Sequence, residues 1–374
     1  MFGLVKETLR GLIDTSLRYM IRHGYEMTLL DCFVRAFDTS STSYLRYKLY
    51  PKDIKQFKTP ISFSAMHQGE FAIILQGPIE LKDNFTRDTV ILYQQLYPKA
   101  VIIISTWDNT PQSVLNEFVS LGCEVVINKQ FEGSGFGNVN YQICTSLAGI
   151  RKAKELGANF TLKSRTDFRL YKNYGLEFLK SLLLRYPVDD TLGIPLKSRI
   201  IGLEGWRGSR YYPYWMQDYL YFGETEDLEN LFSIEYDKRT LEECKKLTNK
   251  NGILNFSNGK EYCETVPAEI YIMKSFLSKY LTIDGSMKQY WDIVKHYFVI
   301  LCFDDLEILW KKYAPTDSMS LWSSFYNGEK VFKEEERSHS FQFFCSLCEG
   351  MVTYDERVER MREKTKYDIP NQRN

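Results

Sequence analysis

The chain has 374 residues, of which 44% are hydrophobic, so it is long enough and apolar enough to bury a substantial core. Its 48 basic and 48 acidic side chains cancel. A protein without net charge has no bulk field to attract nucleic acid or an anionic membrane. The composition therefore argues against a disordered chain and against a nucleic-acid partner, and any anion site must be local.

Residues 1–23 predict an amphipathic helix, because apolar residues recur every three or four positions with charged residues between them. The segment lacks the uncharged apolar run of a secretory signal or a membrane-spanning helix. Two interpretations stay open: a peripheral anchor on the inner face of the plasma membrane, aided by arginines, or a helix packed on the main domain. Residues 24–66 look like an irregular lead-in with short helical pieces, and we take 1–66 as a helical N-terminal extension.

From residue 70 buried strands alternate with helices. We predict strands at 71–75, 101–104, 124–128 and 160–163, and helices at 86–97, 111–121 and 139–156. This alternation predicts an α/β fold with a mostly parallel, doubly wound sheet flanked by helices. Ligands of such sheets bind where the strands end. Those ends are polar or contain glycine: Gln76-Gly77-Pro78, Ser105-Thr106-Trp107, Asn128 and Arg165-Thr166-Asp167.

Beyond Asp167 the pattern is looser. We predict a helix at 174–186, a short strand beginning at 193–195, a loop at 198–214, a strand at 217–222, a helix starting at 226–232, a polar surface excursion at 233–265 and a helix at 267–280. The core domain is placed at 67–310, and 311–374 is placed in a helical C-terminal extension.

The eight cysteines are dispersed through apolar segments, which is typical of reduced thiols in a cytoplasmic protein. Cys345 and Cys348 form an isolated C-x-x-C pair without a second pair at zinc spacing. A redox pair is the alternative, but we expect two apolar residues on a buried helix. The four histidines do not cluster at metal spacing either.

The first candidate site is the segment Lys163–Arg169. If the strand continues, Lys163, Arg165 and Asp167 share one face. Two cations and a carboxylate suit a diphosphate, bound directly or through Mg²⁺ or Mn²⁺ held by Asp167. The alternative is an internal salt bridge from Asp167 to Arg165 or Arg169.

The second candidate is the glycine-rich loop 133–137, which precedes a predicted helix. Its backbone amides and the positive helix end could approach an anion, and Asn138, Asn140 and Gln142 suit sugar hydroxyls. The spacing fits neither the dinucleotide fingerprint nor a Walker phosphate loop. A flexible linker explains the glycines equally well.

Asp218 and Glu269 are the third candidates. Asp218 stands at the start of an aromatic strand, where it would be partly desolvated, and Glu269 lies in the first turn of a helix. Either could remove a proton from an acceptor hydroxyl. A structural hydrogen bond for Asp218 and a helix-start role for Glu269 are the alternatives.

At these residues the sequence resembles the WavE-type lipopolysaccharide synthesis proteins, a family assigned to glycosyltransferases of bacterial surface glycans. The resemblance runs from about residue 70 to 310, with its motifs in order. They are Ile74–Ile79, Ile103–Trp107, Asn138–Gln142, Leu162–Arg169, Gln217–Gly223 and Pro267–Tyr271.

The resemblance implies a Rossmann-like fold of the GT-A type, which binds nucleotide-sugars. It places Arg165-Thr166-Asp167 where other members of that fold carry Asp-x-Asp. The first acid is replaced by Arg165, so the need for a metal stays open.

The implied activity is sugar transfer from a nucleotide-sugar to a glycan or lipid-linked glycan of lipopolysaccharide or capsule. The nucleoside would lie near Gln76, Gly77 and Pro78 and near Ser105–Trp107. The diphosphate would lie near Lys163, Arg165, Asp167 and Arg169, and the acceptor near Asp218 and Glu269. The alternatives are a phospho- or nucleotidyltransferase of the same pathway and a non-catalytic assembly subunit.

Overall fold

The chain forms two compact units, Met1–Asp53 and Ile54–Asn374, in this computed structural model. The structure describes residues 2–40, 54, 65–203, 212–247, 259–311, 341–358 and 360. The first unit contains helices α1 (Phe2–Arg22) and α2 (Glu26–Ser40). The predicted helix at 1–23 is confirmed. The lead-in is more regular than expected, because Glu26–Ser40 contains neither glycine nor proline and forms a continuous helix.

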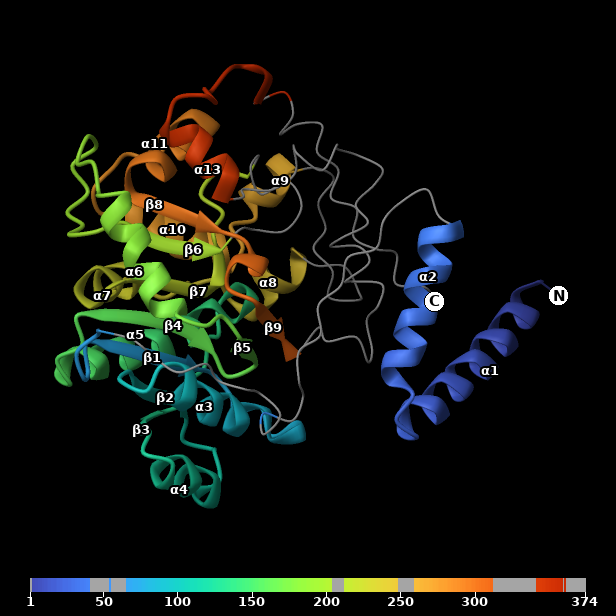
Figure 1. Cartoon of the computed structure of the whole chain (residues 1–374). Coiled ribbons are helices and arrows are strands. Elements are labelled where there is room, and N and C mark those ends of the chain that lie inside the picture. Colours follow the sequence, from blue (N-terminus) through green and yellow to red (C-terminus); the bar gives the residue numbers. More distant parts are fainter. Residues whose placement is uncertain are drawn as a thin grey trace. The chain divides into compact units, whose positions relative to one another are not determined.

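The second unit is built on a seven-stranded sheet with the order β3-β2-β1-β4-β7-β6-β8 (Figure 1). The strands are β1 (Phe71–Gln76), β2 (Val101–Trp107), β3 (Glu124–Asn128), β4 (Phe160–Arg165), β6 (Ile200–Leu203), β7 (Gln217–Glu224) and β8 (Phe298–Leu301). Within this sheet β7 alone runs against its neighbours β4 and β6, and the other pairings are parallel. The predicted α/β fold, a mostly parallel sheet flanked by helices, is confirmed.

A small antiparallel sheet pairs β5 (Phe168–Leu170) with β9 (Ile308–Trp310). The helices of the second unit are α3 (Phe85–Leu96), α4 (Gln112–Ser120), α5 (Val139–Glu155), α6 (Gly175–Arg185), α7 (Thr225–Phe232), α8 (Leu241–Lys246), α9 (Gly259–Glu264), α10 (Ala268–Leu277), α11 (Met287–Tyr297) and α13 (Phe341–Cys348). Short 3₁₀ turns lie at η2 (Lys82–Asn84), η3 (Phe136–Asn138) and η5 (Phe303–Asp305).

The second half of the chain differs most from the sequence expectations. The strand predicted at 193–195 is wrong, and β6 lies instead at Ile200–Leu203, inside the predicted loop. Four residues are too few to show an alternating hydrophobic pattern. β6 forms a strand because it pairs with β7 and β8. The polar excursion contains α8 and α9, and α11, β8 and β9 were not predicted.

Further sequence predictions concern the cysteine pair, the C-terminal extension and possible membrane-spanning helices. Cys345 and Cys348 are half-buried free thiols on α13. Most of the predicted helical C-terminal extension, 312–340 and 361–374, lies outside the described residues, as do 204–211 of the predicted loop. None of the helices in the described ranges combines the length and apolar character that crossing a bilayer requires.

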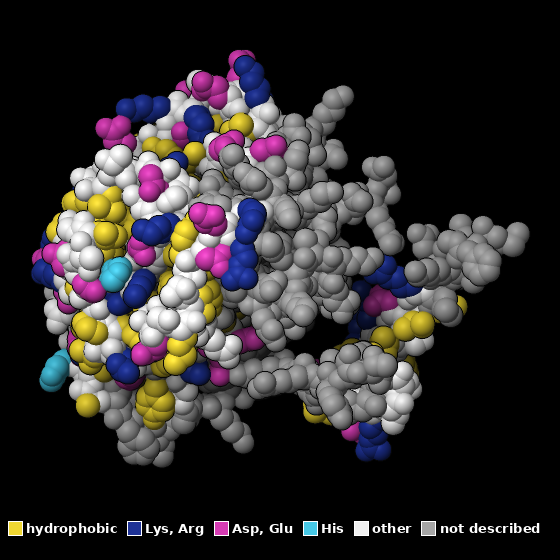
Figure 2. Space-filling model, turned by 90° about the horizontal axis from the view of Figure 1, so that it is seen from above, with side chains coloured by type: hydrophobic (Ala, Val, Ile, Leu, Met, Phe, Trp, Pro, Cys, Tyr) yellow, Lys and Arg dark blue, Asp and Glu magenta, His cyan; other side chains and the backbone are white. Residues whose placement is uncertain are grey.

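Charges of both signs are interspersed over the described surface. On the face shown in Figure 2, basic side chains lie among acidic ones, as the zero net charge leads one to expect. Beneath this surface β1 is apolar up to its last residue, Gln76, and Ala72, Ile73, Ile74 and Leu75 are fully buried. Polar groups therefore gather where β1, β2 and β4 end.

Candidate functional site

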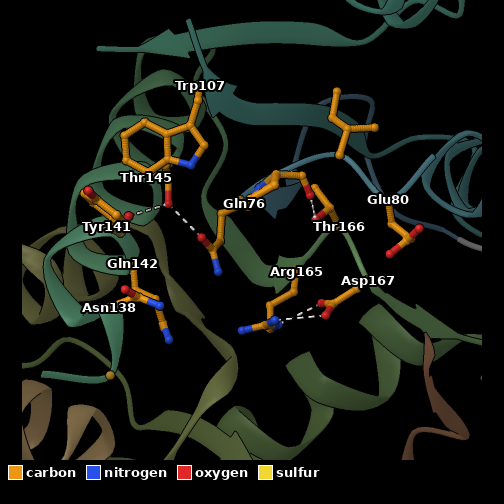
Figure 3. A pocket seen from close by; sticks show the side chains of 14 residues that line it. Gln76, Glu80, Trp107, Asn138, Tyr141, Gln142, Thr145, Arg165, Thr166 and Asp167 are labelled. Atoms are coloured by element: carbon orange, nitrogen blue, oxygen red, sulfur yellow. Dashed lines mark hydrogen bonds and ion pairs between the residues drawn. The ribbon is translucent and has the colours of Figure 1, made fainter. Parts of the chain in front are cut away.

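A cavity of about 450 Å³ lies at the carboxyl ends of β1, β2 and β4 (Figure 3). Parallel pairing puts Gln76 level with Ser105 on one side and with Arg165 on the other. The start of α5 and the turn before it form the opposite wall. The lining residues are Gln76, Gly77, Pro78, Ile79, Glu80, Trp107, Gly137, Asn138, Tyr141, Gln142, Thr145, Arg165, Thr166 and Asp167.

Many of the predicted binding residues meet in this cavity. Gln76, Gly77, Pro78, Trp107, Asn138, Gln142, Arg165 and Asp167 all line it. The parallel arrangement brings these side chains together from segments up to 91 positions apart, Gln76 to Asp167. Gln76, Trp107 and Asp167, which follow three different strands, thus share one open space.

Arg165 and Asp167 form a two-pronged ion pair on one side of the cavity. Arg165 Nε donates to Asp167 Oδ1 at 2.8 Å, and Nη2 donates to Oδ2 at 2.9 Å. Trp310 Nε1 also donates to Asp167 Oδ2, at 3.0 Å. Burial alone would raise the pKa of Asp167, but the hydrogen bonds and charge of Arg165 outweigh burial and hold this pKa below its usual value. Asp167 is therefore a carboxylate at neutral pH.

The environment of Asp167 does not fit the divalent cation that the sequence left open. A guanidinium and an indole N–H already engage its carboxylate oxygens. In the described part of the chain, no cluster of three or more His, Cys, Asp or Glu side chains is arranged to hold a metal ion. β4 ends at Arg165, and Asp167 lies in the turn that follows, so Asp167 does not continue the strand face of Lys163 and Arg165.

The opposite wall is neutral and aromatic. The Thr145 hydroxyl donates to Gln76 Oε1 at 2.6 Å, which turns the Gln76 amide nitrogen toward the cavity (Figure 3). The rings of Trp107 and Tyr141 meet edge to face, with centroids 5.1 Å apart. Such a wall suits a flat or hydroxyl-rich ligand, because it combines ring surface with amide hydrogen-bonding groups.

Asp218 and Glu269 lie behind the wall and do not line the cavity. Gln142, which does line it, donates through Nε2 to Asp218 Oδ2. Asp218 is only 3% exposed. Burial first, and then the charge of Asp218, raises the pKa of Glu269 to about 8, so Glu269 is protonated at neutral pH. The two acids therefore lie within electrostatic reach of each other.

Lys163 is likewise absent from the lining of the cavity. It is fully buried, donates to the backbone carbonyl of Asp218, and lies 5.8 Å and 5.6 Å from the ring centroids of Tyr221 and Phe232. Burial lowers the pKa of Lys163 to about 7. Lys163 therefore does not line the cavity, although it interacts electrostatically with Arg165 and Asp167.

The remaining predicted binding residues form internal hydrogen bonds. Ser105 Oγ donates to the Thr145 carbonyl at 2.7 Å, and the hydroxyls of Thr106 and Thr110 lie 3.1 Å apart. Arg169 is 2% exposed and donates to the Phe85 carbonyl at 2.9 Å. These three predicted residues support the cavity from behind.

The glycine-rich loop is held in place on a neighbouring segment. Asn140 Nδ2 donates to the carbonyls of Gly133 and Asp237 at 2.6 and 2.9 Å. Asp237 Oδ2 in turn accepts from the backbone N–H of Phe136 at 2.9 Å. Asn140 thus shapes the loop, whereas Gly137 and Asn138 line the cavity.

Sequence reasoning missed several lining residues. Tyr141 and Thr145 follow Asn138 by three and seven positions and so share its helix face, a spacing that could have identified them. Glu80 and Thr166 carry no comparable signal. Thr166 Oγ1 donates to the Pro78 carbonyl at 2.5 Å and thereby ties the ends of β1 and β4 together.

The fold and the cavity define an α/β protein with a ligand site at the strand ends, containing one paired arginine and a neutral aromatic wall. The chain belongs to the WavE lipopolysaccharide synthesis family, whose family model matches residues 71–352. The resemblance seen in the sequence is therefore confirmed. No curated protein matches the chain.

Solved structures show distant likeness to parts of the chain. A protein of Desulfovibrio desulfuricans G20, provisionally described as a nucleotide-diphospho-sugar transferase, is 12% identical, with a TM-score of 0.29 over 46% of this chain and 72% of its own. HddC from Yersinia pseudotuberculosis is 15% identical, with a TM-score of 0.27 over 46% and 85%.

The mannosyltransferase PcManGT from Pyrobaculum calidifontis, solved with GDP-Man and Mn²⁺, is 10% identical, with a TM-score of 0.29 over 50% of this chain and 54% of its own. Similarity at this level does not identify a shared ligand or activity.

Proposed function

We propose that this protein is a glycosyltransferase that moves a sugar from a nucleotide-sugar donor to a growing bacterial surface polysaccharide, lipopolysaccharide or capsule. Membership of a lipopolysaccharide synthesis family supports the pathway. The observation that carries the activity is the placement of Arg165 opposite a neutral, aromatic wall in a cavity at the ends of parallel strands. Such strand ends are where α/β sheets bind nucleotides.

The donor is proposed to lie across the cavity. Its nucleoside rests by Gln76 and the Trp107–Tyr141 pair, its diphosphate by Arg165, and its sugar by Asn138 and Gln142. Each part then meets matching chemistry: ring and amide groups for the nucleoside, a guanidinium for phosphate oxygens, and amides for sugar hydroxyls.

In the proposed transfer, the acceptor hydroxyl oxygen forms a bond to the anomeric carbon. The bond from that carbon to the β-phosphate oxygen breaks, and the nucleoside diphosphate leaves with the electron pair. The hydroxyl proton passes to a base or to water. Arg165 stabilises the charge that develops on the leaving phosphate, which is the usual electrostatic contribution to group transfer.

Neither of the two acids predicted to remove the proton lines the cavity, and Asp218 is the one that is hydrogen-bonded to a lining residue. Glu269 is protonated at neutral pH and therefore suits a proton acceptor less well. Asp218 reaches the cavity through Gln142, so we propose that it orients the Gln142 amide toward the acceptor. In this arrangement Asp218 is a positioning residue and Gln142 is the group that touches the sugar.

The activity is tested by incubating the purified protein with UDP-, GDP-, CMP- and TDP-sugars and with lipopolysaccharide precursors from a strain that lacks the protein. We expect one donor to release its free nucleotide only when acceptor is present, with a matching mass increase of the acceptor. Release of pyrophosphate would instead favour a nucleotidyltransferase of the same pathway. Unchanged donors throughout would favour a non-catalytic assembly subunit.

We also propose a cytoplasmic protein that contacts the inner face of the plasma membrane through α1. Several large apolar side chains of this helix are exposed, among them Leu12 at 63% and Ile13 at 52%, and basic residues such as Arg10 and Arg18 accompany them. An amphipathic helix of this kind binds anionic bilayers through its apolar face and its cations.

The expected result is that deleting residues 2–22 removes most of the binding to anionic lipid vesicles in a flotation assay and leaves a folded protein. Ile13→Asp should weaken vesicle binding strongly, because it puts a carboxylate on the apolar side. Thr15→Asp adds the same charge at an exposed polar position and should have a smaller effect. Equal losses for both substitutions would mean that net charge, and not the apolar side, governs the contact.

A further inference from the structure

We infer that Arg165 supplies the counter-charge for the donor's diphosphate without a divalent cation, and that Asp167 is a positioning residue for Arg165 and not a metal ligand. This inference rests on the proposed function, because it concerns the phosphate end of the same donor site.

The guanidinium of Arg165 is fixed in both position and orientation. Its two bonds to Asp167 hold one edge of the group. The rings of Trp310, Tyr219 and Phe168 surround it, with centroids 5.5, 5.9 and 6.0 Å from Cζ. Aromatic faces attract a guanidinium and restrict its movement. The group is therefore held in advance for a planar, two-pronged contact with phosphate oxygens.

Figure 3 shows the direction in which the Arg165 side chain extends. Arg165 extends from the end of β4 into the open space between Asp167 and the wall that carries Asn138 and Gln142. An anion in the cavity therefore meets the outer edge of the guanidinium, whereas Asp167 binds the inner edge.

A divalent cation at Asp167 would compete with these partners for the carboxylate oxygens. Both carboxylate oxygens already accept hydrogen bonds, from Arg165 and from Trp310. A metal ion there would also stand next to the guanidinium charge, which repels it. The other cavity carboxylate, Glu80, accepts a hydrogen bond from the backbone N–H of Lys82 at 2.9 Å. The side chains around Asp167 and Glu80 thus favour a cationic side chain over a metal ion as the phosphate-binding group.

The experiment measures binding of UDP, GDP and TDP, and of their monophosphates, by calorimetry in chelator-treated buffer and again with Mn²⁺ or Mg²⁺. The ratio of diphosphate to monophosphate affinity reports the phosphate subsite itself, since general loss of structure weakens both ligands alike. We expect at least one diphosphate to bind with the same Kd, within about twofold, in chelator and in metal.

Asp167→Asn should lower the diphosphate-to-monophosphate ratio roughly five- to tenfold, to the same extent in chelator and in metal, because the guanidinium loses its charged partner. The matched control is Asp355→Asn, because Asp355 also pairs with an arginine two positions away, Arg357, on an exposed segment. The control should leave the ratio unchanged.

Three outcomes would overturn the inference. One is diphosphate binding that requires Mn²⁺ or Mg²⁺. Another is a tenfold gain in diphosphate affinity when metal is added, provided that Asp167→Asn abolishes this gain. Such a result would identify Asp167 as a metal ligand. In both cases the proposed function stands, because a diphosphate still binds. Absence of binding for every nucleotide under both conditions would reject the inference and the donor site together.

Discussion

Replacement of Arg165 by methionine is expected to lower kcat/KM for the donor at least 100-fold, about 2.7 kcal/mol of transition-state stabilisation. Methionine matches the length and apolar stem of arginine and can pack against Trp310, Tyr219 and Phe168, so the fold should persist. The charge that meets the leaving phosphate is lost. Turnover is measured as nucleotide release, and folding by the circular dichroism spectrum and melting temperature.

Two further variants sharpen this test. Arg165→Lys keeps the charge but not the two-pronged geometry, so it should fall between the parent and methionine. Arg357→Met removes an exposed arginine that also pairs with an aspartate two positions away, and it should retain full turnover. If Arg165→Met turned over donor as fast as Arg357→Met, Arg165 would have no part in transfer.

Gly149→Val is expected to destabilise the second unit by about 3 kcal/mol, the upper range for overpacking a core. Helix α5 lies so close to the sheet here that a Cβ on Gly149 would stand 2.6 Å from Ile74 Cγ2 and 3.3 Å from Ser105 Cβ. Both neighbours belong to central strands and cannot retreat easily. The free energy of unfolding is measured by urea titration.

The same substitution should weaken donor binding, because α5 carries Tyr141, Gln142 and Thr145 on the cavity wall. Ala148→Val is the control: it adds a β-branched residue at the neighbouring helix position, which is partly exposed, and should cost about 0.5 kcal/mol through helix propensity alone. Equal stability of the two variants would show that the helix can shift away from the sheet without loss.

The first half of the fold could be predicted because each element there carries its own pattern. The strand at Phe71–Gln76 contains the uninterrupted apolar run Phe71–Leu75, and the helix that begins at Val139 follows a glycine-rich turn. In the second half, Ile200–Leu203 and Phe298–Leu301 are only four residues long. Segments of that length become strands through the neighbours they pair with, and their neighbours are distant in sequence.

The site was predictable to the extent that strand ends define it. Gln76, Trp107 and Arg165 were identified because each follows an apolar strand. The sequence could not separate Trp107, which lines the cavity, from Ser105 and Thr106, which bond internally. Lys163 and Asp218 were predicted to belong to the site, but both are buried and neither lines the cavity. Burial depends on the side chains that pack against a strand, which the local sequence does not specify.

The sequence by itself determined the α/β class, the family and the strand ends where ligands gather, because hydrophobic periodicity and short motifs are local properties of the chain. Only the tertiary structure decided that Arg165 and Trp310 both bond to Asp167, and that Asp218 accepts a hydrogen bond from Gln142. These contacts join residues up to 143 positions apart. Packing between distant segments determines which charged groups pair with each other and which face the cavity. A local sequence pattern therefore cannot predict these contacts.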